Sequence, residues 1–414
     1  MPWKATDPLK ERTKFLLEWE RRWEDAQGGP VNLAELCRMF GISRPTGYEW
    51  VKRYRDANLE IAAAIKERSR RPKTSPTAIS DEMADLIVEA RKEHPKWGAR
   101  KLRARLVELN PGKYVPSASV MAKVLKQRGL TTPRRRRRNP KATGVTAPFS
   151  ECNAPNDVWC IDFKGWFETG DGERCYPLTL LDAYSRFLLR CEVLLEPDGK
   201  HVRSVLDSAL LEFGLPKAIR SDGGPPFAST GPARLTELSV WLLRLGVRIE
   251  IIAPGKPQQN GRLERFHRTL AEDTADPPAE SCVAQQRRFD LNRREYNHDR
   301  PHESLGMRPP ARIYTPSSRT YPRPLVRRAP EPFCRELRID KRGFITWNRR
   351  KVFISSALRC EYIELDFDPD GRWAVRWGAI PLGFLDEHAP QRGLIVTRRR
   401  RGEATVVGQS YIDV

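Results

Sequence analysis

Long apolar segments are missing from this sequence of 414 residues. No run reaches the roughly 18 apolar residues that a membrane-spanning helix needs. The N-terminal segment MPWKATDPLKERTKFLLEWERRW is charged throughout, whereas a secretory signal joins a basic end to an apolar stretch. We therefore expect a soluble, unsecreted protein without a membrane partner.

Paired cysteines are also missing. Eight cysteines are scattered along the chain without CxxC spacing, so neither a structural zinc site nor a disulfide framework is expected. Their distribution suits a reducing cytoplasm.

Negative charge is scarce relative to positive charge. The chain carries 74 Lys plus Arg against 53 Asp plus Glu, a formal net charge of +21. This balance favours a polyanionic partner, which we take to be nucleic acid, with an anionic membrane surface as the weaker alternative. The length exceeds that of one ordinary core, so about two to four domains are expected.

A helix-turn-helix pattern occupies residues 31–54. Two short helices flank a turn at Gly41, and the second helix opens with Ser43 as its predicted N-cap. This helix is predicted to bury Tyr48 and Val51. A small helical bundle that binds protein is the alternative. The outward side chains, which are candidate DNA contacts, are Arg44, Thr46, Lys52 and Arg53.

A second trihelical pattern spans residues 77–130. Apolar residues recur there at i, i+3, i+4 and i+7 spacing, Ser117 precedes the last helix and Gly129 ends it. We interpret it as another helix-turn-helix-like DNA-binding module. Its outward candidate contacts are Lys123, Lys126 and Gln127.

A basic linker follows over residues 131–155. Its composition cannot bury a core and is expected to stay extended. We interpret it as a DNA-tracking segment because guanidinium groups bind phosphates well; a solvated charge run is the alternative. The consecutive arginines are Arg134, Arg135, Arg136, Arg137 and Arg138.

From residue 156 onward, apolar strands alternate with amphipathic helices. DVWCIDF, CYPLTLLDAY and RFLLRCEVLL are predicted strands, after which helix and strand alternate as far as the helix QQNGRLERFHRTLAEDT. This order is typical of an α/β sheet covered by helices. We assign the core to residues 156–275 and a helical extension with a Pro-rich connector to residues 276–329.

Short strands separated by turns such as DPDG fill residues 330–414, which predicts a small β-barrel with a basic tail. The first helix-turn-helix domain is assigned to residues 1–70. The predicted fold class is therefore multidomain: N-terminal all-α helix-turn-helix modules, a central α/β core and a C-terminal small β-barrel.

One acid interrupts an apolar strand. Period-two alternation in DVWCIDF places Asp162 on the face of Val158 and Cys160, and Trp159 and Ile161 on the other face. A carboxylate there is costly unless it is paired or bound to a metal.

Two further acids stand where a ligand can approach. Asp222 closes a predicted strand and precedes two glycines, and strand ends of α/β sheets are where ligands gather. Glu264 lies on a predicted helix, with Asn260 and Arg268 four residues away on either side as a polar stripe.

Three carboxylates brought together repel one another unless cations lie among them. Hard oxygen ligands suit Mg²⁺ or Mn²⁺, and two such ions about 3.5–4 Å apart can activate an attacking oxygen and stabilise a leaving oxygen. Phosphodiester cleavage or exchange is the predicted reaction. Each acid taken singly is equally well explained as a salt-bridge or cap residue.

Five motifs occur in order: WCIDFKGWF, LTLLDAYSRF, RSDGGPPFAS, APGKPQQNGRLERFHRTL and YNHDRPHESLGMRPP. Together, over about residues 156–315, they resemble the retroviral-integrase-like catalytic core of bacterial insertion-sequence DDE transposases. The resemblance implies an RNase H-like fold in which Asp162, Asp222 and Glu264 form the catalytic triad and hold two metal ions. The β-rich end resembles, in pattern only, the SH3-like barrel that follows some integrase cores.

The resemblance also implies roles for neighbouring residues. Gln259, Asn260 and Arg268 are candidate DNA contacts beside the triad. Apart from the resemblance, Asp182 is interpreted as a structural turn residue, with an approach to the metals as the alternative. His267 is interpreted as a packed or solvated residue, with a contact to substrate phosphate as the alternative. The 41 residues between Asp222 and Glu264 exceed the spacing typical of retroviral integrases, with the extra length expected around STGPARL, and no N-terminal His/Cys zinc module occurs.

The predicted function is a DNA transposase that binds terminal inverted repeats, hydrolyses a phosphodiester and joins the freed 3′-OH to target DNA. Its expected partners are transposon ends, target DNA and further copies of itself, as a dimer or larger oligomer. No small-molecule cofactor is expected, and the expected location is the bacterial cytoplasm at the nucleoid. The alternatives are a non-catalytic DNA-binding regulator and an RNase H-like nuclease without strand transfer.

Overall fold

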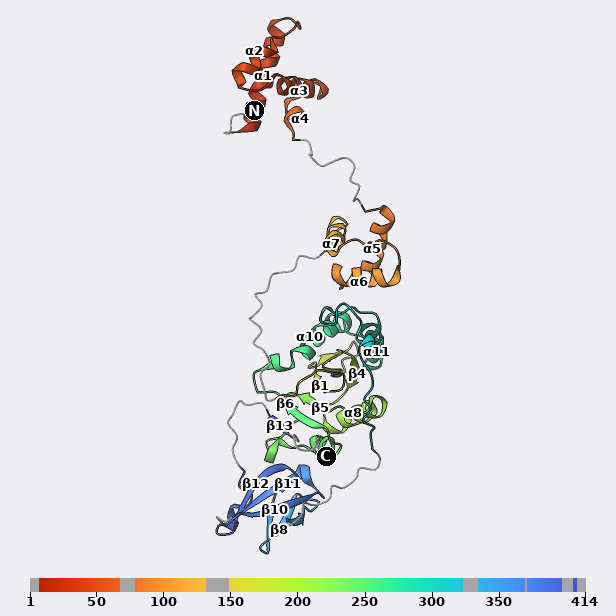
Figure 1. Ribbon diagram of the computed structural model, residues 1–414, viewed down its shortest axis with the longest axis vertical. Coiled ribbons are helices and arrows are strands. Elements are labelled where there is room, and N and C mark those ends of the chain that lie inside the picture. Colours follow the sequence, from red (N-terminus) through yellow and green to blue (C-terminus); the bar gives the residue numbers. More distant parts are fainter. Residues whose placement is uncertain are drawn as a thin grey trace. The chain divides into compact units, whose positions relative to one another are not determined.

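The computed structural model describes residues 7–67, 79–131, 149–322, 334–368, 371–396 and 405–407. It contains two compact units, Met1–Ala78 and Ile79–Val414 (Figure 1). Within these described segments, no helix is both long and apolar enough to cross a membrane.

The first unit is a small helical domain with a closely packed helix-turn-helix. A Cβ on Gly47 would stand 2.3 Å from Cys37 Sγ, so only glycine permits this approach of the two helices. The backbone N–H of Thr46 donates to Ser43 Oγ at 3.4 Å, which confirms the predicted N-cap. The helices are α1 (Pro8–Asp25), α2 (Leu33–Phe40), α3 (Arg44–Asp56) and α4 (Ile61–Ile65).

The buried face of α3 differs from the predicted one. Tyr48 is 64% exposed, so its predicted burial is wrong. Val51 is buried as predicted, together with Trp50 and Tyr54. The contact of Gly47 with α2 sets the orientation of the helix, and residues three, four and seven positions further on share that face.

The second helical module forms at the start of the second unit. Ser117 Oγ accepts from the backbone N–H of Val120 at 3.4 Å, as predicted for an N-cap. Ile87, Leu102 and Met121 are fully buried and hold the three helices together. The helices are α5 (Asp81–Glu93), α6 (Ala99–Leu109) and α7 (Ala118–Gln127).

The central region contains all the strands and helices that the sequence predicted for the core, and its strands form one sheet. Its order is β13-β6-β5-β1-β3-β2, with β4 also paired to β3. Strands β1, β5 and β6 run parallel, whereas β3 is antiparallel to β1 and β4. The elements are β1 (Val158–Phe163), β2 (Phe167–Glu168), β3 (Arg174–Asp182), β4 (Leu188–Leu194), α8 (Gly199–Phe213), β5 (Ala218–Ser221), α9 (Glu237–Arg244), β6 (Arg248–Ile251), α10 (Gly261–Leu270) and α11 (Cys282–His298).

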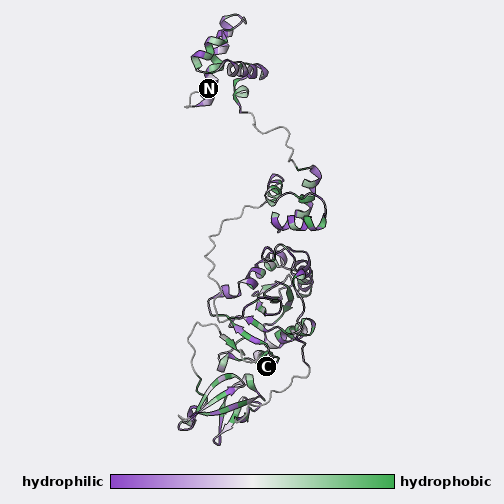
Figure 2. Cartoon of the chain, viewed as in Figure 1, coloured by the Kyte–Doolittle hydropathy of each residue, from purple (hydrophilic) through white to green (hydrophobic). Residues whose placement is uncertain are grey.

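The sheet has two differently covered faces. One large apolar cluster joins the inner residues of α8 and α9 to one face of the strands, and a smaller cluster joins α10 and α11 to the other. Figure 2 shows the hydrophobic residues along the central strands. The short helices are η1 (Pro232–Arg234), η2 (Pro257–Asn260), η3 (Ala271–Ala275), η4 (Glu303–Leu305), η5 (Pro310–Arg312), η6 (Ser356–Leu358) and η7 (Pro390–Arg392).

The C-terminal region is β-rich, as predicted, but a closed barrel is not confirmed. Its described strands form one sheet, β12-β11-β10-β7, and a separate hairpin, β8-β9. Ile345 and Trp347 of this region belong to the same apolar cluster as Trp241 of α9, and Arg244 pairs with Glu361 at 3.1 Å. The strands are β7 (Arg335–Arg338), β8 (Phe344–Trp347), β9 (Arg350–Phe353), β10 (Tyr362–Asp368), β11 (Arg372–Trp377) and β12 (Ile380–Asp386).

A short segment of the predicted basic tail returns to the central sheet. Strand β13 (Thr405–Val407) pairs antiparallel with β6, and Val407 is buried in the large apolar cluster. This segment is therefore an ordered edge strand, although the sequence predicted only a tail.

Candidate active site

Strand β1 presents alternate residues to the two faces of the sheet. Trp159 and Ile161 lie in the cluster beneath α8 and α9. Val158 and Cys160 lie in the cluster beneath α10 and α11. The predicted alternation is confirmed, and it carries Asp162 to the face that α10 covers.

Asp222 lies beside the end of β1 because β5 runs parallel to it. Cys160 pairs with Arg220, so the next residues of both strands emerge at the same edge. A Cβ on Gly224 would stand 3.2 Å from Asp222 Oδ2. The glycine therefore leaves room around this carboxylate.

Glu264 is exposed on α10, whose opposite side packs on the sheet through Leu263 and Phe266. A polar contact holds this helix over β1: Thr179 Oγ1 and His267 Nε2 lie 2.6 Å apart. The same hydroxyl contacts the backbone oxygen of Asp162 at 3.1 Å. His267 is thus buried and structural, as predicted, whereas no sequence pattern indicates the role of Thr179.

The three carboxylates interact electrostatically. Burial, together with the negative charges of Asp222 and Glu264, raises the pKa of Asp162 to about 7. Burial also raises the pKa of Asp222, which the N–H of Gly224 and the charge of Arg234 partly offset. Removing these acids from water beside one another is unfavourable without a cation.

The donor set fits a hard divalent cation. Asp222 Oδ1 is buried and has no hydrogen-bond partner in the described structure, and carboxylate oxygens are the preferred ligands of such ions. Among the described residues, no three His, Cys, Asp or Glu side chains lie close enough to hold an ion as they stand.

Arg234 is a cation beside the carboxylates that the sequence did not single out. Its Nη2 donates to the backbone oxygen of Gly223 at 3.0 Å. Ala233 and Arg234 both have positive φ, 50° and 58°, which is strained for residues with a side chain. The turn lies in the extra length around STGPARL, so only the tertiary structure brings it to Asp222.

The predicted contacts near the triad lie at different depths. Arg268 is exposed on α10. Gln259 Oε1 accepts from the backbone N–H of Ala253 at 2.8 Å and so holds the loop before α10. Asn260 is only 3% exposed, and neither polar atom of its amide has a partner in the described residues. Its role as a DNA contact stays a prediction.

The predicted contacts in the helical modules lie mostly on the surface. Arg44 and Lys52 are exposed, and Thr46 is half-buried. Arg53 is half-buried over the ring of Trp50 at 4.6 Å. The predicted contacts on α7, which are Lys123, Lys126 and Gln127, are all exposed. The run Arg134–Arg138 lies outside the described residues.

Asp182 is fully buried and fixes the turn after β3. It accepts from the backbone N–H of Asn156 at 2.8 Å and from the N–H and hydroxyl of Ser185 at 2.7 and 2.6 Å. These bonds satisfy its oxygens without a metal, in agreement with its structural interpretation.

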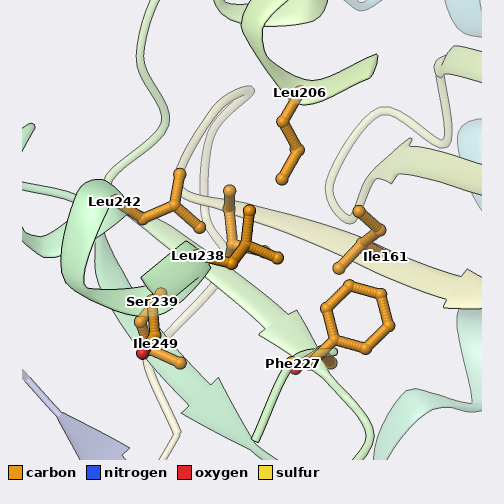
Figure 3. Close-up of a pocket in the computed structure, with 9 residues that line it drawn as sticks. Ile161, Leu206, Phe227, Leu238, Ser239, Leu242 and Ile249 are labelled. Atoms are coloured by element: carbon orange, nitrogen blue, oxygen red, sulfur yellow. The ribbon is translucent and has the colours of Figure 1, made fainter. Parts of the chain in front are cut away.

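A small cavity lies on the other face of β1 (Figure 3). Its volume is about 10 Å³, which is at the lower limit for one water molecule. Ile161, Leu206 and Phe227 are among the apolar side chains that surround it. It is a gap in the core beneath α8 and α9 rather than a substrate site.

Comparisons with known families match this architecture. Two family models described as an integrase core domain match residues 153–257 and 245–310. Residues 153–310 of the chain therefore match an integrase core domain. A helix-turn-helix domain matches residues 18–73, and a homeodomain-like domain matches residues 46–125.

Relatives of this integrase-core chain come from bacterial insertion elements. An uncharacterized 39.2 kDa protein of insertion element IS476 from Xanthomonas euvesicatoria is 27% identical over 69% of this chain and 72% of its own length. A 31.7 kDa protein of insertion element IS407 from Burkholderia multivorans is 29% identical, over 68% and 90%. The resemblance to insertion-sequence transposases with an integrase-like core is confirmed.

Viral proteins also resemble this chain. The Gag-Pol polyprotein of avian reticuloendotheliosis virus is 30% identical over 30% of this chain and 10% of its own length. A chain of the simian T-cell lymphotropic virus intasome structure, solved in complex with PP2A regulatory subunit B56 gamma, is 17% identical. It covers 76% of this chain and matches over 100% of its own length with a TM-score of 0.34, too low to argue from.

Proposed function

We propose that this chain is a DNA transposase that binds the terminal inverted repeats of an insertion sequence and joins them to target DNA. The observation that carries the proposal is the electrostatic influence of Asp222 and Glu264 on the buried Asp162, in a region that matches an integrase core domain. The helix-turn-helix matches support the DNA-binding half of the proposal.

The reaction consists of two phosphoryl transfers. In the first, water attacks the phosphorus at the transposon end, the P–O3′ bond breaks, and the end is left with a free 3′-OH. In the second, that 3′ oxygen attacks a target phosphorus and displaces a target 3′-OH. Both steps form one P–O bond and break one, so neither needs an oxidant or an energy-rich cofactor.

The three carboxylates would hold two Mg²⁺ or Mn²⁺ ions, whose chemistry when bound is to activate the attacking oxygen and neutralise the leaving oxygen. Asp162 and Asp222 supply ligands from adjacent parallel strand ends. Glu264 supplies the third from α10, whose position over β1 depends on the contact of His267 with Thr179.

The other predicted sites are proposed as DNA contacts. Arg44, Thr46, Lys52 and Arg53 would read the end sequence, with Lys123, Lys126 and Gln127 on the second module. Arg134–Arg138, in the linker assigned to residues 131–155, would contact phosphates. Arg268, Gln259 and Asn260 would act near the scissile bond, and two ends held together require a dimer or larger oligomer in the bacterial cytoplasm.

The deciding experiment uses the Glu264→Gln variant on a labelled end duplex with Mg²⁺. The substitution keeps side-chain size and removes one negative charge, so end binding should survive while 3′-end cleavage and joining are lost. Asp162→Asn should behave alike, and combining the two should add little because residues of one site are not additive. Near wild-type joining by Glu264→Gln would show that the third ligand lies elsewhere.

Two controls separate the alternatives. A target plasmid detects joined products, which a nuclease without strand transfer cannot form. Wild-type chain that binds ends but neither nicks nor joins them with Mg²⁺ or Mn²⁺ would instead be a DNA-binding regulator.

A further inference from the structure

A cluster of basic side chains lies on the side of α10 that faces away from Glu264. Arg262 and Arg265 are three residues apart and share one face of the helix, whereas Glu264 points about 100° away from Arg265. We call this set the basic cluster; its members are Lys101, Arg186, Arg262, Arg265 and Arg300.

Two of these guanidinium groups converge on one neutral oxygen. Arg262 Nη1 donates to the backbone oxygen of Ala183 at 2.6 Å, and Arg186 donates to the same oxygen. Arg186 has a φ of +64°, so the turn accepts strain in order to place it. Among the described residues, neither Arg186 nor Arg262 has a carboxylate within ion-pair distance. Two full positive charges therefore share one partial negative charge.

Among the residues that the structure describes, only one member of the cluster has a carboxylate within ion-pair distance. Arg300, which is 8% exposed, pairs with Asp273 at 2.6 Å. Next to it, the His302 ring packs edge-on against Tyr296 with centroids 4.7 Å apart. His302 Nε2 is buried and has no partner in the described residues. Burial and the neighbouring positive charges of the cluster lower the pKa of His302 to about 3.

Helix α6 of the second module completes the cluster. His94 Nδ1 lies 3.0 Å from Glu295 Oε1, and Arg105 pairs with Asp299 at 2.8 Å. These contacts hold the second module, through the residue after α5 and through α6, against the end of α11, and they bring Lys101 to the cluster. Burial and the charge of Arg300 lower the pKa of Lys101 to about 8, because the site gathers more positive charge than its carboxylates neutralise.

We propose that the basic cluster binds a backbone phosphate of duplex DNA, at a position separate from the three carboxylates. The inference rests on the proposed function, because it takes DNA as the substrate. Arg262 and Arg265 are exposed and supply the forked donors that suit phosphate oxygens. A phosphate would neutralise the unpaired guanidinium groups.

The position of the cluster gives the phosphate a structural role. One side of the basic cluster belongs to α10, the helix that carries Glu264, and the other side belongs to α6 of the second helical module. DNA bound there contacts both, so it couples recognition by the module to the placement of the catalytic helix. The active site and the end-recognition module are thus bridged by DNA backbone as well as by protein.

The test measures binding rather than chemistry. The full chain carries Glu264→Gln, which blocks the reaction, and a second pair of changes, Lys101→Gln with Arg265→Gln. Affinity for a labelled end duplex is measured by fluorescence anisotropy across a salt series. Loss of these two cations should reduce the slope of log Kd against log salt by up to about 0.9, the value expected for one phosphate contact.

A matched control removes the same charge elsewhere. Arg287→Gln with Arg294→Gln changes two exposed arginines of α11 and should leave the slope close to that of the parent. Equal slopes for the two double variants would overturn the proposal. Restoration of the parent slope by Lys101→Arg with Arg265→Lys would support it, since charge is kept. Melting temperatures of all variants guard against loss of folding.

A parallel experiment with inorganic phosphate tests whether the cluster binds free phosphate or the phosphate of DNA. If inorganic phosphate raises the melting temperature of the parent but not of Lys101→Gln with Arg265→Gln, while both bind DNA alike, the cluster takes free phosphate and the DNA proposal fails. The proposed function can fail independently of this site. If the wild-type chain binds ends with the expected salt slope but never joins them, the transposase function is wrong while the phosphate site remains supported.

Discussion

The two faces of the central sheet differ in their balance of apolar and polar contacts. Beneath α8 and α9, one apolar cluster runs from the strands into the C-terminal sheet. Beneath α10 and α11, directional polar contacts supplement a smaller cluster: His267 contacts Thr179, and the Asn297 amide exchanges two bonds with the backbone of Leu188 at 2.8 and 3.0 Å.

The difference matches the tasks of the two faces. Apolar packing is non-directional and tolerates small shifts of a helix. Hydrogen bonds fix distance and angle, so a helix tied by them can position a carboxylate. We infer that the face beneath α8 and α9 mainly stabilises the fold and the face beneath α10 and α11 mainly sets the geometry of the candidate site.

Asp222→Asn should separate catalytic activity from fold stability most strongly. Joining activity should fall by about 10²–10³-fold or more, the size found when one electrostatic contact to a transition state is lost. Without metal, the variant should be at least as stable as the wild type, because repulsion of Asp162 is removed. Strand-transfer assays and thermal melting in EDTA test both parts; a large fall in melting temperature would contradict the comparison.

Leu206→Ala should produce the converse result. Leu206 is fully buried and borders the existing cavity, so truncation should lower the free energy of unfolding by about 2–5 kcal/mol. Specific joining activity of the folded fraction should stay near wild type at low temperature. Urea unfolding monitored by tryptophan fluorescence gives the first quantity; a comparable loss in specific activity would erase the distinction between the faces.

Thr179→Val should affect both properties moderately. It leaves the buried His267 nitrogen without its partner, which costs about 1–3 kcal/mol, and it loosens α10 above Asp162. We expect joining activity to fall more than DNA binding does. The control is Thr179→Ser, which keeps the hydroxyl and should retain most of the activity.

The smallest expected effect is a change in pH dependence at His302. Its pKa in the folded state is lowered to about 3, from 6.5, mainly by burial. The unfolded chain therefore binds the proton more readily, and stability is present above pH 6.5 and is lost as pH falls towards 3. His302→Phe keeps an aromatic ring against Tyr296 and should flatten the melting temperature over that range; an unchanged profile would assign the acid sensitivity to other groups.

Much of the core is predictable because local periodicity and sheet geometry agree. The alternation of residues in β1 is enough to place Asp162 opposite Trp159, and the glycines after Asp222 mark a strand end. The capping pattern locates α3 and α7 through Ser43 and Ser117. These signals depend on neighbours in sequence, so they survive without tertiary information.

The remaining features depend on contacts between distant segments. Arg234 reaches Asp222 through a strained turn, and Lys101 reaches α11 through the docking of α6; neither position has a local signature. The burial of Tyr48 is wrongly predicted because the Gly47–Cys37 contact, rather than the apolar pattern of α3, fixes the helix orientation. The prediction of a closed C-terminal barrel rests on the number of short strands. Strand number does not determine how the strands pair into sheets.

The edge strand β13 is synthesised long after β6, the strand with which it pairs, and this order affects folding. Residues 405–407 lie near the end of the 414-residue chain, yet they border β6, from which the chain continues towards α10. During translation, the earlier strands emerge while the backbone donors and acceptors on that edge of β6 are still open. The central sheet is therefore completed only after residues 405–407 have left the ribosome, and a chain that lacks them would expose a strand edge able to pair with other chains.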